Sequence, residues 1–278
     1  MGRYYALHEG FDEDFALALK EHYKPEFSGD TLPSGKTGAS VALADKIDTI
    51  CGLFGIGKPP TGSKDPYSLR RAAIGVLRIV VEKNLDLNLT EVFKEAGFLY
   101  GDKLTNKKAY QDAADFVMSR FPAKYKEEGV RQDSVAAVSA VCLDSPFDFD
   151  RRLRAVEDFR SMPEALSLTM ANKRVKNILK DQDTSVIAAA KSDLNEESEK
   201  KLASALSHHE SHIGPILEKG DYTAALKALS SLKPTLDTFF DEVKVMADEE
   251  KVRLGRLNLL HRLSQLFLRV ADISRLQS

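Results

Sequence analysis

Residues 39–84 read ASVALADKIDTICGLFGIGKPPTGSKDPYSLRRAAIGVLRIVVEKN, and this stretch decides the fold class. Its first half carries one apolar stripe, made by Leu43, Ile47, Ile50 and Phe54. Its second half repeats the pattern with Leu69, Ala73, Val76 and Val80. Apolar residues that recur every three or four positions line one face of a helix, so the stretch predicts two packed amphipathic helices.

A turn rich in glycine and proline separates the two predicted helices. Its glycines supply permissive backbone, and the Pro59-Pro60 pair prevents the first helix from continuing. Asp65 followed by Pro66 predicts an N-cap with proline at the first helical position. The second helix is therefore expected to begin at Pro66.

The same turn matches two nucleotide-binding motifs only in part. Gly52-x4-Gly57-Lys58 begins a P-loop, but proline occupies position 59, where Ser or Thr must hold magnesium. A dinucleotide fingerprint starting at Gly55 fails because Pro60 occupies its third glycine site. Both motifs also follow a strand, whereas the preceding segment here is helical in pattern. We therefore interpret the turn as a rigid connector.

The residues around this turn also carry a family resemblance. ADKIDTICGLFGIGKPPTGSKDPYSLRRAAIGVLRIVVEKNL closely resembles the β subunit of the bacterial heterotetrameric glycyl-tRNA synthetases. The match continues in register through LYGDKLTN (99–106), ANKRVKNILK (171–180), FFDEVKVMADEEKVRLGRLNLLHRL (239–263) and LFLRVADISRLQ (266–277). That family's β chain is much longer, and Met1 corresponds to its interior. The resemblance therefore implies a C-terminal portion of the subunit.

Composition is that of an ordinary globular protein with room for two domains. The chain has 278 residues, 43% of them hydrophobic and 29% charged. No apolar run reaches the eighteen or so residues that a membrane span needs, and no signal peptide follows Met1. Cys51 and Cys142 lie in apolar helical patterns and are expected to be buried free thiols. These features predict a cytoplasmic protein without a membrane partner.

The fold class predicted from periodicity is all-α, since no segment alternates with period two for long. A first helix should carry Phe11, Phe15, Leu19 and Tyr23 on one face, capped near Asp12. Later helices are expected over about 105–121, 134–143, 149 onward, 163–180 and 248–274, with a polar, mobile loop over 181–195. The turn at residues 144–150 predicts a domain boundary near residue 147. The resemblance implies an HD-like helical domain remnant before it, over 1–147, and a DALR-type helical-bundle anticodon-binding domain after it, over 148–278.

Catalytic and metal-binding motifs are missing from the sequence. No HExxH or CxxC spacing occurs. His208 and His212 share a helical face, but no third ligand stands at a telling spacing, so we interpret them as surface histidines. Asp45 resembles the last aspartate of the HD superfamily, yet one carboxylate cannot make a metal site. The prediction is no metal and no catalytic residue in this chain.

Positive charge is concentrated in the C-terminal half. The formal net charge is −2, which argues against bulk polyanion binding, but residues 251–278 hold six Lys or Arg against one acid. Local basic faces on a nearly neutral chain are typical of proteins that contact nucleic acid at chosen places. Solvated helix faces with no binding role remain an open alternative.

Ten residues are predicted to contact nucleic acid. Lys173, Lys176 and Lys180 recur along one helical side, beside Arg174. A second row, on the last helix, consists of Asn258, Arg262, Gln265 and Arg269. Arg70 and Arg71 form a further cationic spot after the turn, with pairing to acids of a neighbouring helix as an equal alternative. Lys and Arg neutralise phosphates, while Asn, Gln and Arg reach the base edges of unpaired loops.

The resemblance implies a function for these basic faces. It implies the tRNA-binding, non-catalytic part of glycine–tRNA ligase, an aminoacyl-tRNA synthetase in which the α subunit of an α2β2 tetramer uses ATP and Mg. Glycine tRNA is then the nucleic-acid partner, DNA is not one, and this chain itself needs no cofactor. Departures from the usual family pattern at Gly255 and Arg275 argue against assigning base contacts to Arg256 or Arg275. The alternatives are an HD-type metal-dependent phosphohydrolase and a structural helical module.

Overall fold

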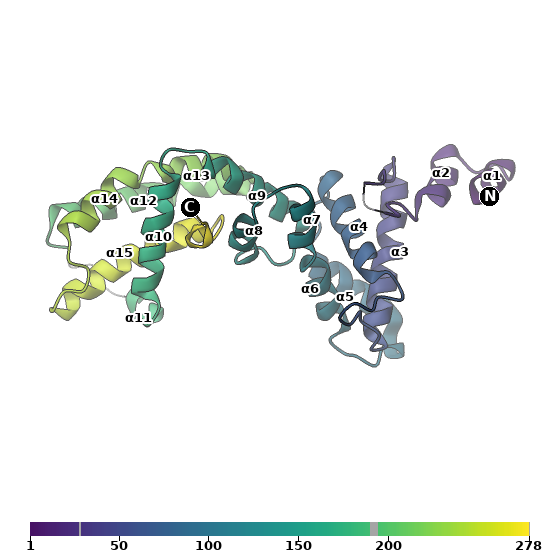
Figure 1. Ribbon diagram of the computed structural model, residues 1–278, viewed down its shortest axis with the longest axis horizontal. Coiled ribbons are helices and arrows are strands. Elements are labelled where there is room, and N and C mark those ends of the chain that lie inside the picture. Colours follow the sequence, from purple (N-terminus) through teal and green to yellow (C-terminus); the bar gives the residue numbers. More distant parts are fainter. Residues whose placement is uncertain (28, 190–193, 278) are drawn as a thin grey trace. The chain divides into compact units, whose positions relative to one another are not determined.

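The computed structural model describes residues 1–27, 29–189 and 194–277. Within those ranges the chain is built from helices and turns, with no strand beyond an isolated bridge between Thr61 and Lys64 (Figure 1). The all-α prediction is confirmed. None of the helices in the described ranges is both long and apolar enough to span a bilayer.

The chain divides into two compact units. Unit 1 consists of residues 1–129 and 143–148, and unit 2 of residues 130–142 and 149–278. Residues 130–142 are thus grouped with the C-terminal unit, although they precede the predicted domain boundary after residue 147. That boundary stays a prediction.

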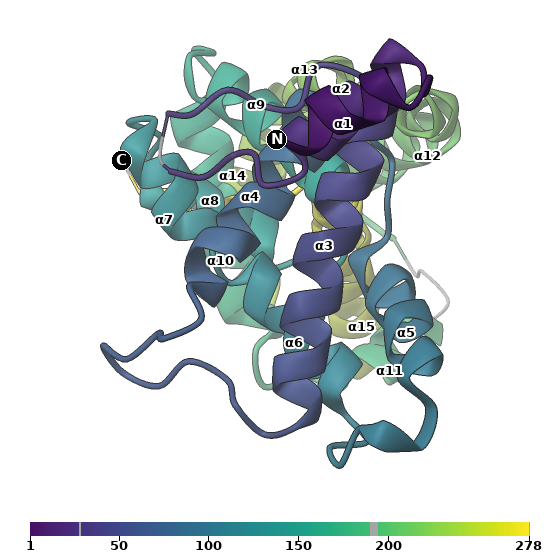
Figure 2. The ribbon, with the colours of Figure 1, turned by 90° about the vertical axis from the view of Figure 1, so that its right-hand side faces the viewer.

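Unit 1 is organised around the long helix α3. Its helices are α1 (Gly2–His8), α2 (Glu13–Glu21), α3 (Lys36–Gly55), α4 (Leu69–Glu82), α5 (Leu89–Tyr100), η1 (Gly101–Lys103), α6 (Ala109–Met118) and α7 (Phe121–Glu127). Helix α3 packs against α2, α4, α5 and α6, and Figure 2 shows it crossing the middle of this unit. The predicted stripes of α3 and α4 are buried throughout, so the pattern identified the core faces.

The start of α4 differs from the prediction. The helix begins at Leu69, after Ser68 in a left-handed conformation, and Pro66 stays outside it. Asp65 still satisfies the first free amides, because its carboxylate accepts hydrogen bonds from the Leu69 and Arg70 N–H groups at 2.8 and 2.9 Å. Asp65 therefore caps the helix as predicted, but its carboxylate reaches the helix across a longer turn than the sequence predicted.

Helix α2 has its predicted cap, since Asp12 accepts a hydrogen bond from the Phe15 N–H at 2.8 Å. The helix is shorter than predicted, since Phe11 and Tyr23 lie outside it. The four predicted stripe residues, Phe11, Phe15, Leu19 and Tyr23, are exposed, with Phe11 and Phe15 stacked on each other. The small residues Ala16 and Ala18 are buried instead, and α2 packs on both α1 and α3. The buried positions of α2 are therefore filled by small side chains.

Unit 2 is a helical bundle around the last helix. Its elements are α8 (Gln132–Ser139), α9 (Pro146–Arg160, which begins in unit 1), α10 (Ala165–Leu179), α11 (Thr184–Ala189), α12 (Glu197–Glu218), α13 (Tyr222–Ser230), α14 (Lys233–Glu242), α15 (Glu250–Leu268) and η2 (Ile273–Arg275). Helix α15 contacts α10, α11, α12 and α13. Four neighbours around one helix leave it little surface for solvent.

Two predicted segments need correction. The loop expected over 181–195 is wrong for 184–189, where α11 forms and buries Ile187 against the bundle; residues 190–193 lie outside the described part of the chain. The helix expected over 105–121 is shorter, since α6 covers 109–118 and α7 begins at Phe121. Both cysteines are buried, as predicted, and neither forms a disulfide within the described residues.

Candidate nucleic-acid interface

Helix α10 presents its four predicted cations on its outer side. The helix buries Leu168, Asn172 and Val175, which recur at spacings of four and three and face the bundle. Lys173, Arg174, Lys176 and Lys180 consequently lie on the remaining surface, where Lys173 is half-buried and the other three are exposed. We call these four residues the α10 cation row.

Lys176 is fixed by an ion pair with Asp272, just after α15. Its ammonium lies 2.7 Å from a carboxylate oxygen that also accepts the Arg275 guanidinium at 3.0 Å, while Ser274 donates to the other oxygen. Burial raises the pKa of the Asp272 carboxyl, but the hydrogen bonds from Lys176, Ser274 and Arg275 outweigh it and lower the pKa overall. Asp272 is thus a charged anchor that holds Lys176 in place.

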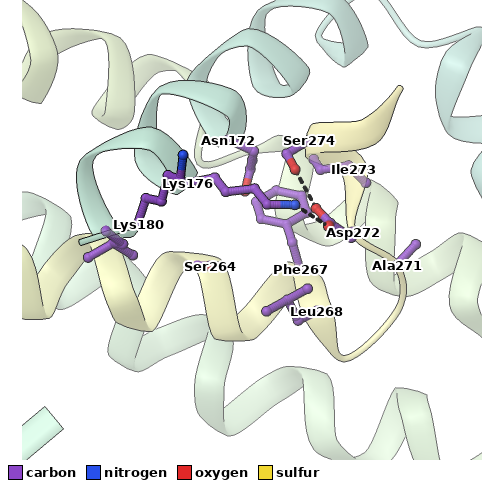
Figure 3. Close-up of a pocket in the computed structure, with 11 residues that line it drawn as sticks. Asn172, Lys176, Lys180, Ser264, Phe267, Leu268, Ala271, Asp272, Ile273 and Ser274 are labelled. Atoms are coloured by element: carbon purple, nitrogen blue, oxygen red, sulfur yellow. Dashed lines mark hydrogen bonds and ion pairs between the residues drawn. The ribbon is translucent and has the colours of Figure 1, made fainter. Parts of the chain in front are cut away.

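A small cavity opens beside this ion pair. It has a volume of about 220 Å³ and lies between α10 and the C-terminal end of α15 (Figure 3). Phe267, Leu268 and Ala271 supply apolar lining, and the Lys176 and Lys180 side chains line it from α10. The cavity is smaller than the roughly 300 Å³ at which drug-sized ligand sites begin, so it suits a single ring system.

Lys173 and Arg174, the two other members of the α10 cation row, do not line this cavity. The Arg174 guanidinium lies 4.2 Å from the centre of the Phe240 ring on α14, a cation–π contact. Lys173 lines a shallow outer surface together with Met170 and Asn177. Within the described part of the chain, neither Lys173 nor Lys180 is paired with an acid.

The structure places Asn258, predicted as a base contact, inside the bundle. Its side chain is only 7% exposed, and its amide donates a hydrogen bond to the Ile187 carbonyl at 2.9 Å. This bond attaches α11 to α15. An RNA contact needs solvent access, so Asn258 does not belong to the interface, and the unrecognised helix α11 is the reason.

Arg262 also serves the bundle. Its Nε and Nη2 atoms donate to the two carboxylate oxygens of Glu210 on α12 at 2.8 and 2.7 Å, and Nη2 also donates to Ser207 at 2.9 Å. A two-pronged pair of this kind fixes the guanidinium in one orientation. Arg262 is therefore occupied by α12.

Gln265 and Arg269 remain at the surface of α15. Both are exposed, and among the described residues their side chains have no partner. They lie on a different face from Ser264, Phe267 and Leu268, which line the cavity. The structure thus does not bring the α15 row and the α10 cation row together at one cavity.

In unit 1, Arg70 and Arg71 hold their own turn. The Arg70 Nη2 atom donates to the Gly62 carbonyl at 2.6 Å, and Arg71 Nη2 donates to the Ser68 hydroxyl at 2.9 Å. In the described ranges neither guanidinium forms an ion pair with an acid of a neighbouring helix. Arg71 also lines an open hollow beside Tyr23, Asp45 and Tyr67.

A buried ion pair that the sequence did not reveal lies next to the predicted row on α15. Arg256 donates through Nε to Glu199 on α12 and through Nη1 to the Lys244 carbonyl at 2.8 Å. Glu199 is fully buried and also accepts the Asn195 and Glu196 amides in a capping box. The only sequence signal for this arrangement is the spacing of a capping box, with Glu199 three residues after Glu196.

The histidine cluster has a structural explanation. His208 and His212 stack with ring centres 4.0 Å apart on α12, and the buried His209 contacts the Ser231 hydroxyl at 3.2 Å. Burial, with the neighbouring His208 and His212, lowers the pKa of His209. In the part of the chain that the structure describes, no group of three or more potential ligands is arranged to hold a metal.

Comparison with known proteins gives two family matches. The family described as the glycyl-tRNA synthetase beta subunit matches residues 1–140. The DALR anticodon binding domain matches residues 168–273, which include the α10 cation row and all of α15.

Curated relatives agree with these matches over the full chain. The glycine–tRNA ligase beta subunits of Aeromonas hydrophila, Histophilus somni and Photorhabdus laumondii are 52%, 50% and 50% identical to it. Each alignment covers 100% of this chain but 40% of the relative. The chain therefore spans well under half the length of the curated relatives it matches.

Proposed function

Since the chain belongs to the glycyl-tRNA synthetase beta subunit family, we propose that it is the tRNA-binding part of a glycine–tRNA ligase. The α10 cation row carries this proposal. It places cations along one exposed helix, two of them free of acids in the described structure, beside a cavity with an apolar lining. The match of this region to an anticodon-binding domain supports the same conclusion.

The chemistry of the row divides into two tasks. The ammonium groups of Lys173 and Lys180 suit phosphate oxygens, which need charge but little geometric precision. The cavity between Lys180 and Phe267 suits one unpaired base, because single-stranded loops are recognised by taking bases out of the stack. Lys176, which its ion pair with Asp272 holds in place, lines the edge of this cavity.

Catalysis is proposed to occur elsewhere. In this proposal a partner α subunit, within a tetramer of two α and two β subunits in the cytoplasm, uses ATP and Mg to activate glycine. The chain then needs no cofactor of its own. Its contribution is positional, because binding the anticodon arm converts the encounter between the acceptor end and the distant reactive site into an intramolecular event.

A filter-binding titration with glycine tRNA tests the proposal. We expect Lys173→Glu/Lys180→Glu to weaken binding by about tenfold or more and to flatten its dependence on salt, because two phosphate contacts become repulsive. Lys200→Glu/Lys201→Glu is the matched control, since it reverses two exposed lysines of α12 in the same unit.

The specificity of binding is tested with a second RNA. Glycine tRNA with an exchanged anticodon should bind more weakly than glycine tRNA if the cavity accepts an anticodon base. Equal binding of glycine tRNA, the exchanged variant and an unrelated tRNA at moderate salt would contradict the proposed function.

A further inference from the structure

Unit 1 carries an apolar protrusion that its own fold does not use. Phe98 and Leu99, at the C-terminal end of α5, are 80% and 86% exposed. Preceding residues of the same helix, such as Leu89 and Phe93, are fully buried against the unit. Two consecutive large apolar side chains in solvent lower solubility and are commonly retained for binding.

The segment that follows these residues is firmly attached to α3. The Tyr100 hydroxyl donates to the Asp48 carbonyl at 3.1 Å, and the Thr105 and Asn106 amides both donate to the Gly55 carbonyl at 3.0 Å. Leu104 is buried so closely against Gly55 that a side chain there would collide with it. Tyr100 turns inward, and Phe98 and Leu99 are thereby held outward on a fixed support.

Lysines follow this protrusion along the chain. We define the α5 tip as residues 98–108, which are held to Gly55 of α3 by the Thr105 and Asn106 amides at the lower end of unit 1 in Figure 2. The tip exposes three lysines, Lys103, Lys107 and Lys108, against one acid, Asp102. None of these three ammonium groups is paired with an acid within the described residues.

The combination of free cations and an exposed aromatic ring decides between two kinds of partner. Lysine is depleted in protein–protein interfaces, because its ammonium loses hydration there without a precise replacement. Nucleic acid suits both features, since phosphates neutralise lysines and a base stacks on an aromatic face. Charge complementarity therefore favours an RNA over a protein.

We propose that the α5 tip is a second RNA-docking surface, separate from the α10 cation row. Phe98 provides a stacking face for an unpaired or terminal base, Leu99 covers its edge, and Lys103, Lys107 and Lys108 bind the flanking phosphates. This proposal rests on the proposed function, because it takes tRNA as the RNA. It adds a contact in unit 1, outside the region that matches the anticodon-binding domain.

Photocrosslinking of the full chain tests contact directly. Phe98 is replaced by benzoylphenylalanine, and Tyr4, an exposed aromatic residue on α1, is replaced in a matched control. We expect irradiation with glycine tRNA to give an RNA adduct at position 98 at least about fivefold above that at position 4. An adduct with protein alone, or no adduct while the tRNA is bound, would overturn the assignment.

Charge reversal tests the energetic contribution. We expect Lys103→Glu/Lys107→Glu/Lys108→Glu to weaken glycine tRNA binding by about tenfold, and Phe98→Ala by about fivefold. Lys20→Glu/Lys36→Glu/Lys126→Glu makes the same charge change at exposed positions of unit 1 outside the tip and should change binding less than twofold. Unchanged circular dichroism and melting temperature establish that the variants are folded.

The two proposals fail in different ways. If the unmodified chain does not bind glycine tRNA, the proposed function is wrong, and the α5 tip assignment, which takes tRNA as the ligand, is wrong with it. A different result separates the two proposals. If the unmodified chain binds glycine tRNA, and the α10 variants weaken this binding while the α5 tip variants do not, then only the α5 tip assignment is wrong.

Discussion

Helices α10 and α15 carry similar cationic patterns but use them differently. On α15, Arg256 and Arg262 bind Glu199 and Glu210 of α12, whereas on α10, Lys173 and Lys180 face solvent without an acid among the described residues. The difference follows from position in the bundle. Helix α15 is enclosed by four neighbours, so its charges need internal partners, while the outer side of α10 is uncovered.

The comparison teaches that residue type alone does not identify a binding cation. An arginine in contact with a buried carboxylate stabilises the fold, and its removal leaves the carboxylate uncompensated. A lysine with a hydrated ammonium contributes little to the fold and is available to a phosphate. Four substitutions test these roles, all of them measured for stability and two of them also for tRNA binding.

The largest expected effect is that of Arg256→Ala. Glu199 is fully buried, so the loss of the guanidinium should lower the free energy of unfolding by about 3–5 kcal/mol. Urea unfolding followed by circular dichroism measures this change, with Arg269→Ala, an exposed arginine of the same helix, as control. A loss below about 1 kcal/mol would show that the pair is not a structural element of α15.

Asp272→Asn should have an intermediate effect that depends on pH. The carboxylate accepts three side-chain hydrogen bonds, two of them from cations, and we expect a loss of about 2 kcal/mol at pH 7. Because its pKa is below the ordinary value of 3.8 in the folded state, its stabilisation is present above that pH. It is lost as the pH falls through the lowered folded pKa.

Urea unfolding of both proteins between pH 7 and pH 3 checks this sign. The gap in unfolding free energy between the unmodified chain and Asp272→Asn should stay constant above about pH 5 and shrink below it. A gap that widens on acidification would contradict the assigned direction of the pKa shift.

Arg262→Ala should have a smaller effect on stability and almost none on RNA. The Glu210 pair is partly exposed, so we expect a loss of about 1 kcal/mol or less. Glycine tRNA binding should change less than twofold, because the guanidinium is already occupied. A large loss of affinity with normal stability would place Arg262 in the interface and remove the distinction between the two helices.

Arg269→Ala should have the smallest effect on the fold. Its side chain is exposed and unpaired in the described structure, so the unfolding free energy should change by less than about 0.5 kcal/mol. If Arg269 reaches a phosphate of the bound tRNA, affinity falls by about threefold, and Gln265→Ala serves as the uncharged comparison. Unchanged affinity would exclude Arg269 from the interface.

Periodicity predicted the buried faces of α3 and α4 because apolar residues record which side of a helix is covered. It failed for Asn258, since a polar residue in a hydrogen-bonded core position has the same sequence signature as an exposed one. The capping rule identified Asp65 but placed the start of α4 at Pro66, because the Asp65 side chain reaches the amides of residues 69 and 70 across a turn that no local pattern defines.

The sequence by itself determined the helical class, the family and the set of cationic positions, because these depend on local spacing and on many short matched segments. Only the tertiary structure decided which cations are free. Helical spacing fixes the direction of a side chain around its own axis, but the neighbour that covers that direction is set by packing. On α15 that neighbour is α11 or α12, and on the outer side of α10 it is solvent.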